Sequence, residues 1–321
     1  MAAIRPAPVL GVLVLLALPL FATDAYLRHL LVLWMLFALM ALSLNIILGY
    51  LGELSFGHAA FFGLGAYASA MATVYGGMPF AVGLLAAGLS AAVTGAVIGW
   101  IALRIKGPQF AIMTLAFGAI LHSVFVNWVD VTNGPLGITR IPPPDLPVPG
   151  VDFGAAVPYY YLVVAFVLGA AWLSRAIRAS RTGRAFAALR GNDALAASIG
   201  IDVFAHKLIG FSLATAVVGV AGSLYAHYLK IITPDLFTLP YMAAMVIMVI
   251  IGGKGTIVGP ILGAALYVGL LEVLRASGSM RMFVFAALLT LCVIFLPGGL
   301  ASLWPRLVAR FGGRAAPGSA R

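Results

Sequence analysis

Residues 178–207, RASRTGRAFAALRGNDALAASIGIDVFAHK, form a polar stretch in a chain that is otherwise strongly apolar. The stretch holds five Lys and Arg residues against only two acidic residues, Asp193 and Asp202. Lys and Arg that flank membrane spans are retained inside the cell, so this excess predicts a cytoplasmic loop.

The same stretch carries a helical pattern. Small and apolar residues recur at helical spacing between glycines at positions 183, 191 and 200. This pattern predicts two short amphipathic helices joined at Gly191. Small side chains let another protein approach closely, and the arginines around them can pair with its carboxylates. The alternative interpretation is an ordinary solvated loop.

The composition places the chain in a membrane. Hydrophobic residues make up 63% of the 321 residues, charged residues 9%, and the mean hydropathy is +1.11. A soluble domain has about a quarter charged residues, so we expect a polytopic membrane protein. The net charge of +10 comes largely from basic residues at predicted span ends. Membrane topology therefore accounts for the charge, and we expect no nucleic-acid partner.

No catalytic or metal-binding motif stands out in the sequence. The single cysteine, Cys292, excludes an intrachain disulfide, and the five histidines are scattered along the chain. We therefore expect no enzyme active site and no metal site. The 37 glycines instead indicate helices that pack closely through small residues.

Hydropathy predicts an all-α transmembrane bundle of about ten spans with Gly-interrupted helices, as a single domain over residues 1–321. All but five of the nineteen basic residues then lie inside, with both termini cytoplasmic. The first segment is expected to remain uncleaved, with a signal peptide as the alternative. Residues 130–158 form an extracytoplasmic loop, 178–207 the cytoplasmic loop and 301–321 a basic cytoplasmic tail. The predicted spans are 8–22, 30–49, 54–75, 79–103, 110–129, 159–173, 208–229, 241–253, 257–274 and 282–300.

Polar residues collect at a glycine-rich break between the second and third predicted spans. A carboxylate in the hydrocarbon is costly, so Glu53 must face protein, water or a partner. One interpretation is a substrate path or gate, and the other is a helix break at the cytoplasmic surface. The candidate path residues are Asn45, Glu53, Ser55, His58, Gln109 and Thr114.

A second glycine-interrupted element lies in the other half of the chain, at residues 252–263. Offset by 200 residues, Gly52, Gly63 and Tyr67 correspond to Gly252, Gly263 and Tyr267. Paired broken helices in two halves indicate the central pathway of a transporter.

Four segments, taken together, resemble the high-affinity branched-chain amino acid ABC permeases of the LivM-like type. They are LNIILGYLGELSFGHAAFFGLGAY (44–67), TNGPLGI (132–138), GRAFAALRGNDALAASIG (183–200) and IGGKGTIVGPILGA (251–264). Gly191 and Asp193 stand where the family commonly has Glu. The resemblance implies a subunit of an importer in the bacterial inner membrane, built from two related permease subunits, two cytoplasmic ATPases and a periplasmic amino-acid-binding protein.

The resemblance also implies roles for individual residues. ATP and Mg²⁺ would bind the ATPases, and this chain would hold no cofactor. Asn133, Gly134 and Gly137 would belong to the loop that faces the binding protein. The residues expected to couple to the ATPases are Arg184, Ala188, Arg190, Asp193, Ala196 and Gly200.

Three alternatives remain open from the sequence. Sister permeases of the same motif set carry urea, short amides or aromatic acids. An ion-coupled secondary transporter would work without ATPases and would need buried titrating groups such as Glu53 and Glu272. A membrane structural or assembly protein would have no solute path.

Overall fold

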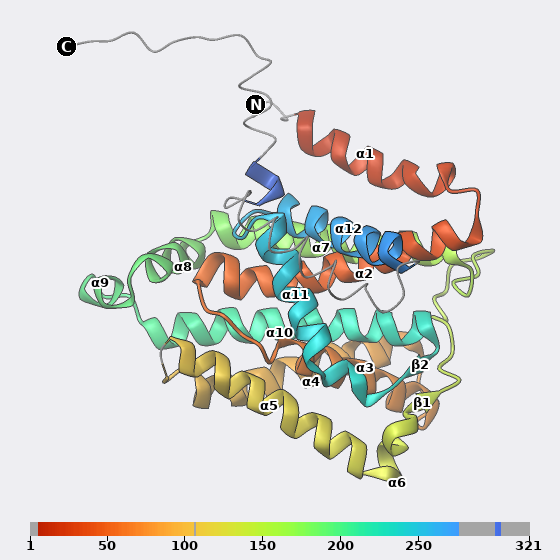
Figure 1. Cartoon of the computed structure of the whole chain (residues 1–321), viewed down its shortest axis with the longest axis horizontal. Helices are drawn as coiled ribbons and strands as arrows, with labels where there is room; N and C mark the ends of the chain where they lie inside the picture. Colours follow the sequence, from red (N-terminus) through yellow and green to blue (C-terminus); the bar gives the residue numbers. More distant parts are fainter. Residues whose placement is uncertain (1–5, 106, 276–298, 303–321) are drawn as a thin grey trace.

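The computed structural model describes residues 6–105, 107–275 and 299–302, which form helices and one pair of two-residue strands. The predicted span 282–300 and the predicted basic tail 301–321 lie almost wholly outside the described residues. Figure 1 shows the arrangement of the helices.

One long apolar helix forms the centre of the bundle. Helix α2 (Ala25–Leu44) continues without a break into the π-helix η1 (Asn45–Leu51). Arg28 is the one Lys, Arg, Asp or Glu among its 27 residues. Of its most apolar 18-residue stretch, 72% is buried inside the protein. At about 1.5 Å per residue the whole helix is ~40 Å long, which is more than the ~30 Å hydrocarbon core requires. Helices α7, α10, α11 and α12 pack around it.

The remaining helices surround this centre. They are α1 (Pro6–Phe21), α3 (His58–Val74), α4 (Phe80–Ala102), α5 (Pro108–Asn127), α6 (Val129–Thr132), α7 (Ala156–Ala179), α8 (Arg181–Gly191), α9 (Asp193–Ser198), α10 (Val203–Leu229), α11 (Leu239–Gly252) and α12 (Val258–Val273). Short 3₁₀ turns are η2 (Gly134–Leu136), η3 (Pro234–Phe237) and η5 (Leu300–Ser302).

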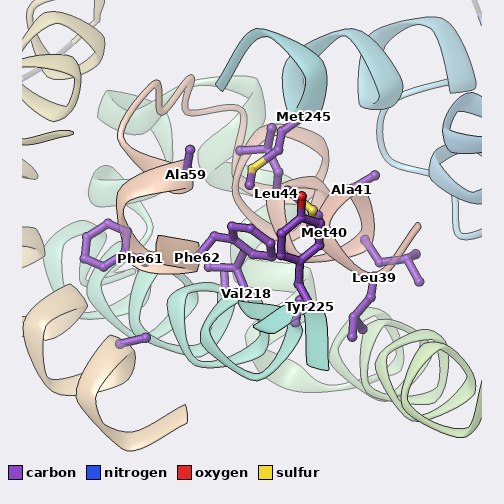
Figure 2. Close-up of a cluster of buried hydrophobic side chains, with 14 of the residues drawn as sticks. Leu39, Met40, Ala41, Leu44, Ala59, Phe61, Phe62, Val218, Tyr225 and Met245 are labelled. Carbon is purple, nitrogen blue, oxygen red and sulfur yellow. The ribbon is translucent and has the colours of Figure 1, made fainter. Parts of the chain in front are cut away.

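Aromatic and aliphatic side chains from four helices fill the space beside α2. Figure 2 shows Leu39, Met40 and Leu44 of α2 together with Phe61 and Phe62 of α3, Val218 and Tyr225 of α10 and Met245 of α11. In a bilayer the lipid is as apolar as these side chains, so packing quality rather than water exclusion selects this arrangement.

Small residues allow α3, α4 and α10 to pack backbone against backbone. A Cβ atom added at Gly222 of α10 would lie 2.1 Å from the carbonyl oxygen of Phe62, and one at Gly65 would lie 2.3 Å from that of Gly219. On α4 the buried residues recur every fourth position, at Gly83, Ala87, Ala91, Gly95 and Gly99. This is the close small-residue packing that the glycine content predicts.

Two short strands join the segment between α6 and α7 to the end of α10. Strand β1 (Ile138–Thr139) pairs antiparallel with β2 (Ile231–Ile232), with Ile138 opposite Ile232. The ring of His227 lies 2.6 Å from the carbonyl oxygen of Pro142, and the Phe80 amide donates to Asp145. The predicted 130–158 loop is therefore a fixed layer across one end of α3, α4 and α10.

The chain is a multi-pass helical protein by length and composition. Five helices are long and apolar enough to cross a membrane, and three shorter apolar helices accompany them in the described part of the chain. The predicted break after the second span is present, since the backbone leaves the helix at Gly52 with φ 83°. The third predicted span starts four residues later than expected, at His58, because residues 52–57 are not helical.

Candidate functional site

Helices α8 and α9 are each started by a capping side chain. The Ser180 hydroxyl accepts from the Gly183 amide at 3.1 Å, and the Asn192 side chain accepts from the amides of Ala194 and Leu195. Such caps satisfy amides that have no partner inside the helix. The prediction of two short helices joined near Gly191 is confirmed, with α9 starting at Asp193.

The faces of these two helices differ from the predicted pattern. On α8 the apolar residues Ala185, Phe186 and Leu189 are buried against the bundle. On α9, Ala196 is only 1% exposed, whereas Leu195 and Ile199 are 66% and 69% exposed. The expectation that Ala196 offers a surface to a partner is corrected: its methyl group supports α9 from within the chain. The exposed apolar side chains here are the large ones of Leu195 and, just past the end of α9, Ile199, and not the small Ala196.

A buried lysine joins this region to the break after α2. The Lys207 ammonium lies 2.5 Å from Glu53 and 2.5 Å from Asp193, and Lys207 is only 4% exposed. Two partly buried carboxylates offset the cost of removing one cation from water. Glu53, expected to line a path or to be solvated at the surface, is instead an ion-pair partner of α10.

A second contact joins α8 to the same break. The Arg190 guanidinium donates to the carbonyl oxygen of Gly49 at 2.6 Å, inside the π-helix η1. Gly52 and Gly255 leave room for this side chain, since an added Cβ at Gly255 would lie 2.7 Å from the guanidinium. Arg190 and Asp193, predicted from the sequence, are therefore both anchored within the chain.

Asn45 connects the two glycine-interrupted elements. Its amide donates to the carbonyl oxygen of Thr256 and accepts from the amide of Gly255, each at 2.8 Å. Asn45 is fully buried, and a Cβ at Gly49 would lie 2.6 Å from the Gly255 nitrogen. The π-helix that precedes the first break is thus in direct contact with the non-helical residues of the second break.

Three of the other predicted path residues are buried in or next to the non-helical segment 52–57. Thr114 accepts from the Phe56 amide at 3.2 Å, and the His58 ring lies 2.7 Å from the Ser43 hydroxyl. Ser55 is buried beside them. Thr114 thus binds the backbone of the break, His58 is bonded to α2, and all three residues are buried within this chain. In the described part of the chain no cluster of three His, Cys, Asp or Glu residues is present.

Gln109 lies elsewhere, on an uncovered face of α5. The exposed residues of α5 recur at helical spacing and mix polar with small and branched side chains, while Phe110, Thr114 and Gly118 on the other face are buried. Gln109 and Asn127 lie at the two ends of α5, and Ser123 is the exposed polar residue inside the helix, next to small residues that another helix can approach closely. The exposed residues are Pro108, Gln109, Ile112, Ala116, Ala119, Ile120, Ser123, Val124 and Asn127.

The predicted outer-loop residues shape a turn. Asn133 has φ 61°, and its side chain donates to the Gly137 carbonyl at 3.0 Å. Gly134 and Gly137 have positive φ and are buried within the predicted receptor-facing loop. Only glycine fits at Gly137, because a Cβ there would lie 1.8 Å from the Ile232 carbonyl oxygen. Asn133 itself is exposed, and the turn presents Leu136, 72% exposed.

Sequence reasoning missed the roles of Lys207, Leu195 and Ile199. Lys207 reads as the last basic residue of a loop, yet it belongs to the first turns of a long apolar helix. The signal that could have revealed this role is the charge of Lys207 inside the helical apolar pattern of residues 203–229. The positions of Arg184 and Gly200 are exposed, and Ala188 is half-buried.

Comparison with known proteins gives a consistent result. The family described as "Branched-chain amino acid transport system / permease component" matches residues 26–294. The high-affinity branched-chain amino acid transport system permease protein LivM of Escherichia coli K12 is 32% identical over 290 residues, which cover 83% of this chain and 68% of LivM. The corresponding protein LivH of the same strain is 28% identical over 82% of this chain and 90% of LivH.

A shorter match is to a permease that is named for another solute. The ribose import permease protein RbsC of Escherichia coli K12 is 32% identical over 153 residues, which cover 45% of this chain and 46% of RbsC. No solved structure matches the chain significantly.

Replacing Lys207 with Met should loosen α9 from the bundle. The change keeps the alkyl stem but leaves Glu53 and Asp193 close together without a cation. Removing one partner of a buried pair costs about 3 kcal/mol, so amide exchange in residues 185–199 should accelerate at least tenfold. Hydrogen-exchange mass spectrometry measures this.

The matched control is Lys254→Met, because Lys254 is exposed on the neighbouring turn. The double variant Lys207→Met, Glu53→Gln should recover part of the protection, since it removes one of the two repelling carboxylates. Unchanged exchange in Lys207→Met would show that the ion pairs do not hold α9.

Proposed function

Because the chain belongs to the family of permease components of branched-chain amino acid transport systems, we propose that it moves branched-chain or related hydrophobic amino acids across the bacterial inner membrane. It is a membrane permease of an ATP-binding-cassette importer rather than an enzyme. The energy comes from ATP and Mg²⁺ bound to partner ATPases.

The contacts of α8 and α9 with the two broken spans support the proposal that ATPase movement is coupled to this chain. Helices α8 and α9 lie together at one end of the molecule (Figure 1). Leu195 of α9 and Ile199, which follows it, are exposed, so they are suited to insert between apolar side chains of an ATPase. Arg190 and Lys207 tie the same helices to Gly49 and Glu53. Movement of the ATPases is therefore passed to the breaks as a rigid displacement.

The uncovered face of α5 supports a second permease subunit as partner. Its exposed alanines at positions 116 and 119 and the hydroxyl of Ser123 allow a second helix to approach closely. A related subunit placed opposite this face would enclose a path between the two proteins. LivM and LivH are two different permease proteins of one organism and both resemble this chain, which favours a heterodimer.

The proposed orientation places α8 and α9 in the cytoplasm, with about ten spans and both termini inside. The excess of Lys and Arg in residues 178–207 supports this orientation. The opposite end, with Leu136 and Asn133 at its surface, then faces a periplasmic amino-acid-binding protein. This binding protein would supply most of the solute selectivity.

Two alternatives differ in how well the structure supports them. A sister permease for urea, short amides or aromatic acids has the same architecture, and the match to RbsC illustrates that solutes vary among relatives. An ion-coupled transporter needs free titrating carboxylates. Glu53 is paired with Lys207, and Glu272 with Arg275 at 3.7 Å, which makes this mechanism unfavourable.

Reconstituted uptake tests the proposal directly. Proteoliposomes that contain this chain, its partner permease and the ATPases should accumulate radiolabelled leucine only with both ATP and the binding protein. Ile199→Asp should abolish co-purification of the ATPases and reduce uptake to background, because a carboxylate cannot be buried in an apolar contact.

Leu136→Asp is the matched control at the opposite end of the molecule. It should leave ATPase association intact and weaken only the response to the binding protein. Leucine uptake without ATPases would contradict the importer function, and normal ATPase association in Ile199→Asp would contradict the docking role of α9.

Cysteine labelling distinguishes the proposed path face from a lipid face. Ala116→Cys on α5 should react with a membrane-impermeant maleimide at a rate that changes on ATP binding, because the path opens alternately. Val93→Cys on the exposed apolar face of α4 should stay unreactive in both states. Lack of reaction at Ala116→Cys in both states would contradict a water-accessible path along α5.

A further inference from the structure

A groove between α4 and α10 is not used by the proposed transport function. Its volume is about 500 Å³, with Ala92, Ala96 and Ala216 as its floor and Leu208, Ile209 and Leu213 as its walls. The close packing of α4 on α10 creates it. Gly95 and Gly99 bring the two helices together, and the alanines beside them are too small to fill the furrow.

The lining of the groove is chemically unlike the face of α5. Ser212 supplies the one hydroxyl among the lining residues. The neighbouring exposed residues of α4, Leu85, Leu89, Val93 and Val97, are aliphatic as well. Apart from the Ser212 hydroxyl, the surface is aliphatic, so it matches an acyl chain better than a polar solute or a polar partner helix.

The positively charged side chain of Arg104 lies near one end of the groove. The Arg104 guanidinium lies 4.3 Å from the centre of the Trp100 ring and 5.8 Å from that of Phe204. Trp100 is one turn beyond Ala96 on α4, and Phe204 is one turn before Leu208 on α10. Arg104 is exposed, and it has no carboxylate partner in the described part of the chain. The two rings hold its position and leave its N–H groups free.

The spacing fits one leaflet of a bilayer. From Ala92 to the end of α4 at Ala102 are ten residues, or ~15 Å, and Arg104 follows in the next turn, so the span is close to the ~15 Å half-thickness of the hydrocarbon core. Tryptophan and arginine side chains at this level are typical of the membrane–water boundary. A lipid headgroup at Arg104 would thus place an acyl chain along Ala96 and Ala92.

We propose that this groove binds an anionic phospholipid, with one acyl chain between α4 and α10 and the headgroup phosphate on Arg104. Arginine donates two parallel hydrogen bonds to a phosphate, which suits it to this role. The bound lipid would support the α4–α10 pair next to Lys207, on the side of α10 that faces away from α5.

Photo-crosslinking in nanodiscs tests the site in the assembled importer. Photoactivatable phosphatidylglycerol, diluted into phosphatidylcholine, should label residues 92–96 and 208–216. Arg104→Gln should lower this labelling about fivefold, which corresponds to the ~1 kcal/mol that one basic residue contributes at an anionic surface. Labelling by photoactivatable phosphatidylcholine should not change, because its headgroup carries no net charge.

Matched variants separate the groove from general lipid contact. Ala96→Phe fills the groove and should lower labelling by both lipids, whereas Val97→Phe adds the same ring to the neighbouring face and should not. Arg175→Gln removes an exposed cation on α7 and should not change labelling. Equal labelling by both lipids in the unmodified complex and in Arg104→Gln would overturn the proposal, as would crosslinks from these residues to the partner permease.

Discussion

The hydrogen bonds of one buried amide hold the structure together where its helices are broken. Backbone groups that leave a helix inside a bilayer have no water to bind, so they need partners within the protein. Asn45 supplies them, since it donates to Thr256 and accepts from Gly255. The glycines at positions 49 and 255 are required for the same reason, because any side chain there would separate the two breaks. Asn45 thus permits two interrupted helices to exist side by side.

The short helices outside the bundle depend on this pairing. Arg190 reaches the carbonyl oxygen of Gly49 only because η1 is wound as a π-helix beside the second break. Lys207 adds a second attachment through Glu53 and Asp193. A force on Leu195 or Ile199 therefore reaches α2, α10 and the α11–α12 junction together. In the proposed mechanism, transport is accordingly a movement of this rigid part.

Much of this architecture follows from the sequence, and the parts that do not have physical reasons. Apolar runs and glycine breaks predicted the helices, the interruption at Gly52 and the two helices around Gly191, because these depend on local chemistry. Three-dimensional contacts were less accessible. Ala196 and Ile199 both fit a helical apolar pattern, and only the docking of α9 determines which is buried. Glu53 looked isolated because its partner, Lys207, is 154 residues away. Gly134 and Gly137 were placed in a loop, but the turn that their positive φ forms could not be predicted without the strand pair.

The central claim is that α9 and the α11–α12 junction move as one part. Spin labels at Ser198 and Lys254, both exposed, in a Cys292→Ser background allow the distance between them to be measured by pulsed electron paramagnetic resonance in the assembled importer. The distance distribution should be the same with and without bound ATP, because Arg190 and Asn45 link the two labelled regions. A shift of the distribution on ATP binding would contradict the rigid connection and the transmission of force through it.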